Sequence, residues 1–312
     1  MKNKNQTNLI SEELHRQVVQ LGTDVPEQPP SFALPLGEVG ISNKTVWVRL
    51  PQGRIPFTAK VTVSLPAELR GIHMSRIERV IAELDEREFV DLRAYGMELG
   101  RQVLDRQRGA HGAVHLSGKL PHVRRSKISG YSSIDSIDIS VDIWLVEAEQ
   151  AVETKVMLGV GVCHITACPC TQLYNRDVFQ IDEQPCPMPT HSQRSLTSLQ
   201  IEGDGEKPGF SDLLNCLESA LHVTQDLLKR PDEAEIVLQS HQSPQFAEDA
   251  VRETARAAAD YFDLLPDATR LIIESLSLES IHIHDVCCRL ETTLAEVRQC
   301  VNQAERRDDS KS

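Results

Sequence analysis

Residues 57–65 alternate strictly between apolar and polar side chains, and this alternation constrains the fold more than any other feature of the sequence. The apolar set is Phe57, Ala59, Val61, Val63 and Leu65, and the polar set is Thr58, Lys60, Thr62 and Ser64. Successive side chains of a strand point to opposite faces, so the pattern predicts a strand with one buried and one exposed face. Such a strand requires a sheet that is covered on one side.

The order of the predicted elements is repeated along the chain. Each half contains strands, then two helical patterns, then strands again. The predicted strands are 44–50, 57–65, 111–116, 137–144, 154–162, 194–201, 271–278 and 281–290, and the predicted helices are 74–84, 88–107, 211–229 and 246–262. Hairpins that flank a helix pair give an antiparallel sheet with helices on one face, which is an α+β fold. We expect an N-terminal arm over 1–40, modules over 41–165 and 166–300, and a disordered tail over 301–312.

Composition excludes several classes of function. The net charge of −13 argues against non-specific nucleic-acid binding and against a basic membrane-binding surface. The sequence has no apolar run long enough for a membrane span and no signal-like segment near its start, so we expect a cytoplasmic protein. The eight cysteines are then free thiols or metal ligands rather than a disulfide framework. Exposed sheet edges need covering, which favours an oligomer.

Cysteine, histidine and glutamate recur in short segments of the second half. Gly161–Gln172 contains Cys168-Pro-Cys170, and Pro189–Arg194 contains His191. Glu233 follows in Lys229–Glu233, and Glu279–Asp285 contains a His-x-His pair. A thiolate, imidazoles and a carboxylate together suit Zn²⁺, and the carboxylate also suits Fe²⁺ or Mn²⁺. Taken singly, each segment also fits a buried thiol or a half-exposed polar face.

These segments form part of an ordered set that resembles the GTP cyclohydrolases of the IB type. The set comprises Gly71-Ile-His-Met-Ser-Arg76, Cys168-Pro-Cys170, His191-Ser-Gln-Arg194, Lys229-Arg-Pro-Asp-Glu233, Phe246-Ala-Glu-Asp249 and Glu279-Ser-Ile-His-Ile-His284. The resemblance spans roughly residues 30–295. It implies the tunnelling fold, with two tandem modules per chain that assemble into barrels across the subunits of a homotetramer.

The resemblance also implies a role for particular residues. The metal ligands fall on Cys168, His191, Glu233 and His282, which would hold one divalent ion, Zn, Mn or Fe. Glu279 falls on the glutamate that anchors the purine, and His284 is a candidate for proton transfer. The residues implied to contact the nucleotide are His73, Arg76 and Arg194.

The implied reaction converts GTP and water to 7,8-dihydroneopterin triphosphate and formate, the first step towards tetrahydrofolate. A divalent metal lowers the pKa of a bound water, which then attacks guanine C8. A carboxylate such as Glu279 accepts hydrogen bonds from guanine N1–H and the 2-amino group, both of which adenine lacks. A histidine such as His284 exchanges protons near neutral pH.

The sequence departs from the family pattern after the Cys-Pro-Cys motif. Thr171-Gln172 stands where the family has Ser-Lys, and an extra loop over 173–189 contains Cys186. Two alternatives follow. In the first alternative, the chain is another tunnelling-fold enzyme, which acts on a related purine or pterin or forms a cyclic phosphate product. In the second alternative, the chain is a non-enzymatic module with a structural zinc site formed by Cys168, Cys170, Cys186 and His191.

Overall fold

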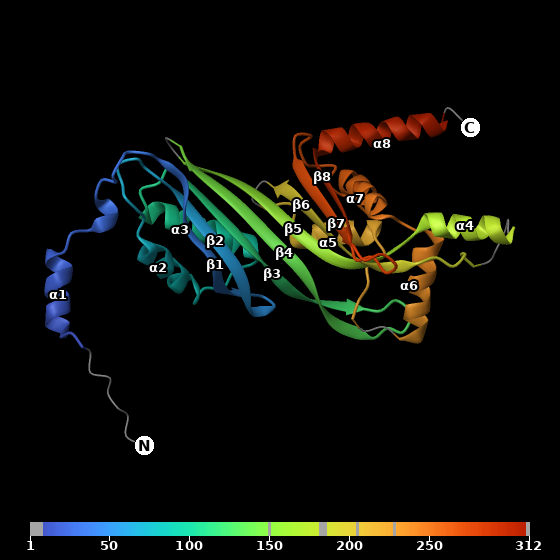
Figure 1. Cartoon of the computed structure of the whole chain (residues 1–312), viewed down its shortest axis with the longest axis horizontal. Coiled ribbons are helices and arrows are strands. Elements are labelled where there is room, and N and C mark those ends of the chain that lie inside the picture. Colours follow the sequence, from blue (N-terminus) through green and yellow to red (C-terminus); the bar gives the residue numbers. More distant parts are fainter. Residues whose placement is uncertain (1–8, 149–150, 181–185, 204–205, 227–228, 310–312) are drawn as a thin grey trace, which may run out of the picture.

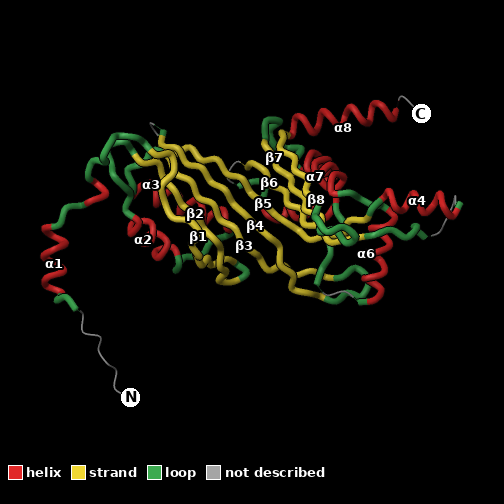
Figure 2. The backbone as a smooth tube through the Cα atoms, in the orientation of Figure 1, coloured by secondary structure: helices red, strands yellow, loops and turns green. Residues whose placement is uncertain are grey.

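The computed structural model describes residues 9–148, 151–180, 186–203, 206–226 and 229–309. One antiparallel sheet contains all the named strands, in the order in which they follow each other along the chain. The strands are β1 (Leu36–Leu50), β2 (Gly53–Leu65), β3 (His111–Arg125), β4 (Ser132–Glu147), β5 (Val152–Ala167), β6 (Ser192–Gly203), β7 (Arg270–Ser277) and β8 (Val286–Thr293). Figure 2 shows them as one continuous twisted sheet.

Helices occupy the connections between the strands and both ends of the chain (Figure 1). They are α1 (Glu12–Leu21), α2 (Met74–Leu84), α3 (Leu92–Arg106), α4 (Pro169–Phe179), α5 (Phe210–Ala220), α6 (Arg230–Gln242), α7 (Ala247–Tyr261) and α8 (Leu294–Asp309), with a short 3-10 turn, η1 (Val25–Glu27). The α+β class and the antiparallel sheet predicted from the sequence are confirmed. No helix in the described ranges is long and apolar enough to cross a membrane.

The core lies between the sheet and the helices that cover one of its faces. In β2 the predicted apolar set is buried, and Thr58 and Lys60 on the opposite side are exposed. Helix α3 approaches the sheet closely at Gly96, where an added Cβ would lie 2.7 Å from Ile143 Cδ1. Gly96 therefore allows α3 to pack closely against β4, and a larger residue there would force the Ile143 side chain to shift.

Four sequence predictions need correction. The predicted helix 211–229 ends at Ala220, and a separate helix, α6, follows from Arg230. The inserted loop 173–189 is helical up to Phe179, because α4 begins at Pro169. The strand predicted at 281–290 begins only at Val286. The tail beyond residue 300 is helical rather than disordered as far as Asp309, while 310–312 lie outside the described residues.

The helix-covered face changes chemistry towards one end of β5, β6 and β7. Leu158, Leu199 and Ile273 lie in the aliphatic core, but farther along the same face the buried side chains carry hydroxyl groups or an imidazole. These polar positions are His164, Thr166, Ser195, Thr197, Ser275 and Ser277. This polar layer adjoins the motif residues Gln193 and Glu279, since the Ser277 hydroxyl lies 3.3 Å from Gln193 Nε2 and donates to Glu279 Oε1 at 2.9 Å.

Candidate functional site

Cys168 and His191 are neighbours at the end of the β5–β6 ladder. The final pair of that ladder is Ala167 with Ser192, and beyond it the Cys168 N–H donates to the His191 carbonyl at 3.1 Å. The Thr190 hydroxyl donates to the Cys168 carbonyl at 2.6 Å. These bonds hold both predicted metal ligands at the same end of the sheet.

The local sequence explains why the chain turns sharply at Cys168. Cys168 is the N-cap of α4, and Pro169 occupies the first turn. Backbone N–H groups in the first turn have no partner within the helix, so proline, which lacks an N–H, costs no helical hydrogen bond there. The Cys168 thiol is half-buried, and the Thr171 hydroxyl donates to its Sγ at 3.6 Å. Cys170 and Cys186 are both exposed. Among the described residues, no three ligand atoms from Cys168, Cys170, Cys186 and His191 lie within 4.8 Å of one another.

Gln193 links His191 to Glu279. The Gln193 Oε1 atom lies 3.2 Å from His191 Nδ1, and its Nε2 lies 3.2 Å from Glu279 Oε1. The Ser277 hydroxyl also donates to Glu279 Oε1, at 2.9 Å. A predicted metal ligand and the predicted purine anchor are therefore joined through one side chain. The motif His191-Ser-Gln-Arg194 contained Gln193, but sequence reasoning assigned it no role.

The β7–β8 connection brings two further histidines to this end. The His282 and His284 rings are stacked, with centroids 5.3 Å apart, and the His282 ring lies edge-on to His191 at 6.3 Å. The sequence placed both on one strand, but residues 278–285 form a loop. Strand alternation therefore does not apply between Glu279 and His282, and both histidines are exposed. Because the rings of His282 and His284 are stacked, the two side chains nevertheless lie on the same side of the loop.

Glu233 lies in the first turn of α6 and is exposed. The start of α6 is anchored by Asp232, whose Oδ1 accepts the N–H groups of Ile128 and Ser129 at 3.1 Å each. Those residues form the tip of the β3–β4 hairpin. The hydrogen bond with Ser129 and the backbone N–H groups lower the pKa of Asp232 to about 2. A carboxylate from the second half and a hairpin from the first half thus set the position of Glu233.

The donor set fits a divalent cation in chemistry, although its members do not converge in the single chain. No three ligand atoms of Cys168, His191, Glu233 and His282, all of which are described, lie within 4.8 Å of one another. Cys168, His191 and His282 nevertheless share one end of the sheet. A thiolate and imidazoles suit Zn²⁺ and related metals. The contact from Gln193 Oε1 to His191 Nδ1 leaves Nε2 as the ring atom available to a metal.

His73 and Arg76 lie at the start of α2, on the opposite side of the molecule from α4 and α6 (Figure 1). His73 Nε2 is 3.5 Å from Asp24 Oδ2 and from Glu27 Oε1. These three are the one group in the described ranges with three ligand atoms within 4.8 Å. Glu27 also pairs with Arg76 at 3.7 Å and with Arg108 at 3.1 Å. Sequence reasoning missed the acidic partners because only the folded arm brings them to His73.

Arg194 is exposed on β6, where it pairs with Ile165 of β5. Its carbonyl accepts the Leu278 N–H at 2.9 Å, which holds the start of the loop that carries Glu279. Because side chains alternate along β6, Arg194 lies on the opposite face of the strand from Gln193. Its backbone therefore supports the site, and its side chain faces away from the polar layer.

Comparisons with known proteins give a family match and a fold match. Residues 23–288 match the family described as type I GTP cyclohydrolase folE2. A GTP cyclohydrolase MptA of Methanococcus aeolicus is 31% identical over 303 residues, covering 88% of this chain and 98% of the relative. A GTP cyclohydrolase MptA of Methanocaldococcus jannaschii is 30% identical over 302 residues, covering 88% and 96%. A uricase from Bacillus fastidious has a TM-score of 0.50 at 8% identity, covering 86% of this chain and 96% of that structure, which concerns the fold alone.

Proposed function

We propose a reaction for this chain from the premise that it belongs to the family of type I GTP cyclohydrolases described as folE2. The sequence motifs resembled GTP cyclohydrolases of the IB type, whereas the family that matches is folE2. The resemblance and the match both indicate a type I GTP cyclohydrolase. The chain is therefore a GTP cyclohydrolase of pterin biosynthesis. Its product, its metal and the roles of its residues are the content of the proposal.

The reaction converts GTP and water to 7,8-dihydroneopterin triphosphate and formate. Water adds to C8 of guanine, the ring opens, C8 leaves as formate, the ribose rearranges and the pterin ring closes. A divalent ion held by Cys168, His191, Glu233 and His282 would supply a water of lowered pKa for the first step. His284 would give and take protons during ring opening, and its stacking on the ring of His282 supports this role.

Recognition of guanine rests on Glu279. Its carboxylate accepts hydrogen bonds from N1–H and the 2-amino group, and its Oε1 is already held by Ser277 and Gln193. Adenine has neither donor, so it would leave this carboxylate unsatisfied at a cost in affinity. The observation that carries the proposal is this joining of Glu279 to His191 beside Cys168.

The phosphates of GTP require cationic donors, and the proposal assigns them to His73 and Arg76. The resemblance also implied Arg194, but its side chain lies on the face of β6 opposite Gln193, so Arg194 is left out of this set. His73 and Arg76 lie far from Cys168 within one chain (Figure 1), so they would reach the site from a neighbouring subunit. Two tandem modules per chain, over 41–165 and 166–300, would then form barrels in a homotetramer. Pairing of the outer strands β1 and β8 across subunits would close the sheet.

A cyclic phosphate of dihydroneopterin is the second candidate product. Two relatives of about 30% identity are named GTP cyclohydrolase MptA, and these names do not distinguish the triphosphate from the cyclic phosphate. A structural zinc site is the remaining alternative. It leaves Glu279, His282 and His284 without a role, whereas the proposed reaction uses all three.

Incubation of the purified full-length protein with GTP tests the proposal. The protein should carry one divalent metal per chain and release formate. Oxidised product should show pterin fluorescence, and its mass should distinguish the triphosphate from the cyclic phosphate. Chelation should abolish turnover and leave the fold intact, whereas unfolding on chelation would indicate a structural zinc site.

Substitution of Cys168 tests the ligand assignment. Cys168→Ala should lose the metal and at least about a hundredfold in turnover, because a metal ligand is removed outright. Cys170→Ala is the matched control, since Cys170 is exposed and two residues away. Full activity in Cys168→Ala would overturn the role of Cys168.

A further inference from the structure

We propose that Gln193 is a positioning residue that couples the metal ligand His191 to the purine anchor Glu279. Its amide contacts both, and this inference rests on the proposed function of those two residues. Gln193 pairs with Thr166 on β5, so its backbone is fixed between two strands of the ladder. The side chain therefore starts from a rigid position and spans from β6 to the end of β7.

The partners of Gln193 determine which way its amide points. A carboxylate only accepts hydrogen bonds, so the group facing Glu279 Oε1 at 3.2 Å must be the NH₂. The same NH₂ lies 3.3 Å from the Ser277 hydroxyl. The flipped amide would place its carbonyl oxygen against the carboxylate, which is repulsive. The carbonyl oxygen is thereby directed at His191.

This orientation selects one tautomer of His191. An amide oxygen only accepts, so the hydrogen bond at 3.2 Å requires a proton on His191 Nδ1. A neutral ring protonated at Nδ1 carries its free electron pair on Nε2, the atom that would bind a metal. Partners that hold the second nitrogen of a metal-binding histidine fix its tautomer and ring orientation. In this chain Gln193 would fix the tautomer and the ring orientation of His191.

The same amide sets the orientation of Glu279. Gln193 and Ser277 both donate to Oε1, and neither of these bonds uses Oε2. Glu279 follows the last residue of β7 by two positions, in a segment without regular structure. Side-chain hydrogen bonds, rather than a strand, therefore hold the carboxylate in register with His191. Disturbing the amide should disturb metal binding and guanine binding together.

Three variants separate this coupling from a merely structural role. Gln193→Leu keeps the bulk and removes both contacts, so Zn²⁺ affinity of the metal-free protein should fall about tenfold and the KM for GTP should rise about tenfold. Gln193→Glu keeps an acceptor for His191 but sets a carboxylate against Glu279, so Zn²⁺ affinity should stay within about twofold while KM rises. Ser277→Ala should raise KM alone.

Zn²⁺ affinity is measured by competition with a chromophoric chelator, independently of turnover. Gln200→Leu is the control: it makes the same change on the opposite face of β6 and should alter neither quantity. A Gln193→Leu protein with a lowered unfolding temperature but wild-type Zn²⁺ affinity and KM would overturn the inference. If the wild-type protein does not turn over GTP, the proposed function fails, while Zn²⁺ affinity still reports on the contact to His191.

Discussion

His164 is the most deeply buried ionisable side chain beside the site. It is fully buried on β5, and its Nε2 bonds the Thr197 hydroxyl at 2.8 Å, which in turn donates to Ser275. Its Nδ1 is buried without a partner. Burial lowers the pKa of His164 to about 4, since a charged ring would lose its hydration there. The polar layer beneath the site therefore contains a neutral imidazole at physiological pH.

The stability of the protein should depend on pH through His164. The unfolded chain binds this proton near pH 6.5 and the folded chain only near pH 4, so stability is lost as the pH falls through that window. Between pH 7 and pH 5 this group should cost about 2 kcal/mol of unfolding free energy. Urea titrations of the wild type and His164→Gln should differ by that amount in their pH dependence. His15→Gln, on exposed α1, is the control. Equal pH dependence in wild type and His164→Gln would refute the prediction.

At the scale of elements, α6 is held by its N-terminus rather than by an apolar face. Its buried residues are only Asp232 and Ser240. Asp232 bonds the hairpin tip of β3–β4 and also accepts the Lys229 N–H at 3.1 Å. The Lys229 Nζ atom lies over the Tyr131 ring, 5.1 Å from its centroid, and this cation–π contact is a second link to the same hairpin. The position of Glu233 therefore depends on contacts with a distant part of the sequence.

Asp232→Ala should release the hairpin tip from α6. The amides of Ile128 and Ser129 should exchange with solvent about tenfold faster, because each loses a charged acceptor. Hydrogen exchange resolved by peptide checks this, and turnover should fall because Glu233 loses its support. Asp212→Ala removes the equivalent cap of α5, where Asp212 accepts the Gly209 N–H, and should leave the hairpin unchanged. Unaltered exchange at the hairpin in Asp232→Ala would contradict the anchoring role.

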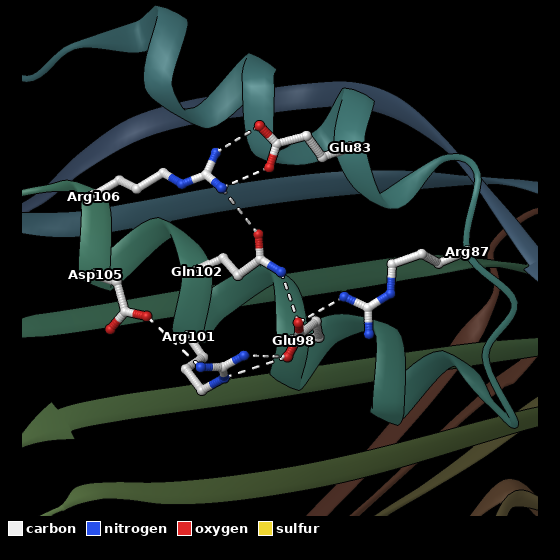
Figure 3. Close-up of polar contacts among 7 residues, drawn as sticks. All are labelled: Glu83, Arg87, Glu98, Arg101, Gln102, Asp105 and Arg106. Carbon is white, nitrogen blue, oxygen red and sulfur yellow. Dashed lines mark hydrogen bonds and ion pairs between the residues drawn. The ribbon is translucent and has the colours of Figure 1, made fainter.

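The α2–α3 pair is joined on its outer side by a network of charges (Figure 3). Arg106 of α3 pairs with Glu83 of α2 at 2.6 Å. Glu98 accepts from Arg101 and from Arg87 at 2.8 Å each, and from Gln102 at 2.7 Å. Burial alone would raise the pKa of Glu98, but these hydrogen bonds outweigh it and lower the pKa to about 2. Glu98 is thus the centre of the network.

Glu98→Gln should lower the free energy of unfolding at pH 7 by on the order of 1 kcal/mol, a value reduced for solvent screening. A depressed carboxyl pKa stabilises the fold above the unfolded value of 4.5, and this contribution is lost as the pH falls towards 2. The difference between the two proteins in denaturant titrations should therefore vanish at low pH. Glu86→Gln, an exposed neighbour, serves as the control. A difference that persists unchanged at pH 2 would contradict the prediction.

At the scale of the whole molecule, the sheet is open at both edges and partly apolar on its uncovered face. In the described part of the chain β1 and β8 each pair on one side only. Trp144, Leu196 and Leu276 are exposed although large and apolar. The two open edges favour pairing with strands of other subunits, and the apolar side chains favour burial of the uncovered face against another subunit.

The proposed homotetramer predicts that light scattering gives a mass four times that of the 34.9 kDa chain. Dilution that produces monomers should abolish turnover, because His73 and Arg76 would no longer reach the partner's metal ligands. Subunits that dissociate with unchanged turnover would show that one chain forms the site alone. The same measurement on Trp144→Lys should show weaker association.

Alternation and helical periodicity were enough to predict the buried face of β2, the bounds of α2 and the antiparallel α+β class. The ordered motifs also indicated a GTP cyclohydrolase, but they named the IB type, whereas the family that matches is folE2. Periodicity did not reveal α6, which buries no apolar stripe, or α4, which buries none of its residues. Which motifs come into contact depends on the folded chain, because those contacts join residues that are far apart in the sequence. Gln193 touches Glu279, and Asp232 touches the hairpin tip, through side chains whose partners no local pattern specifies.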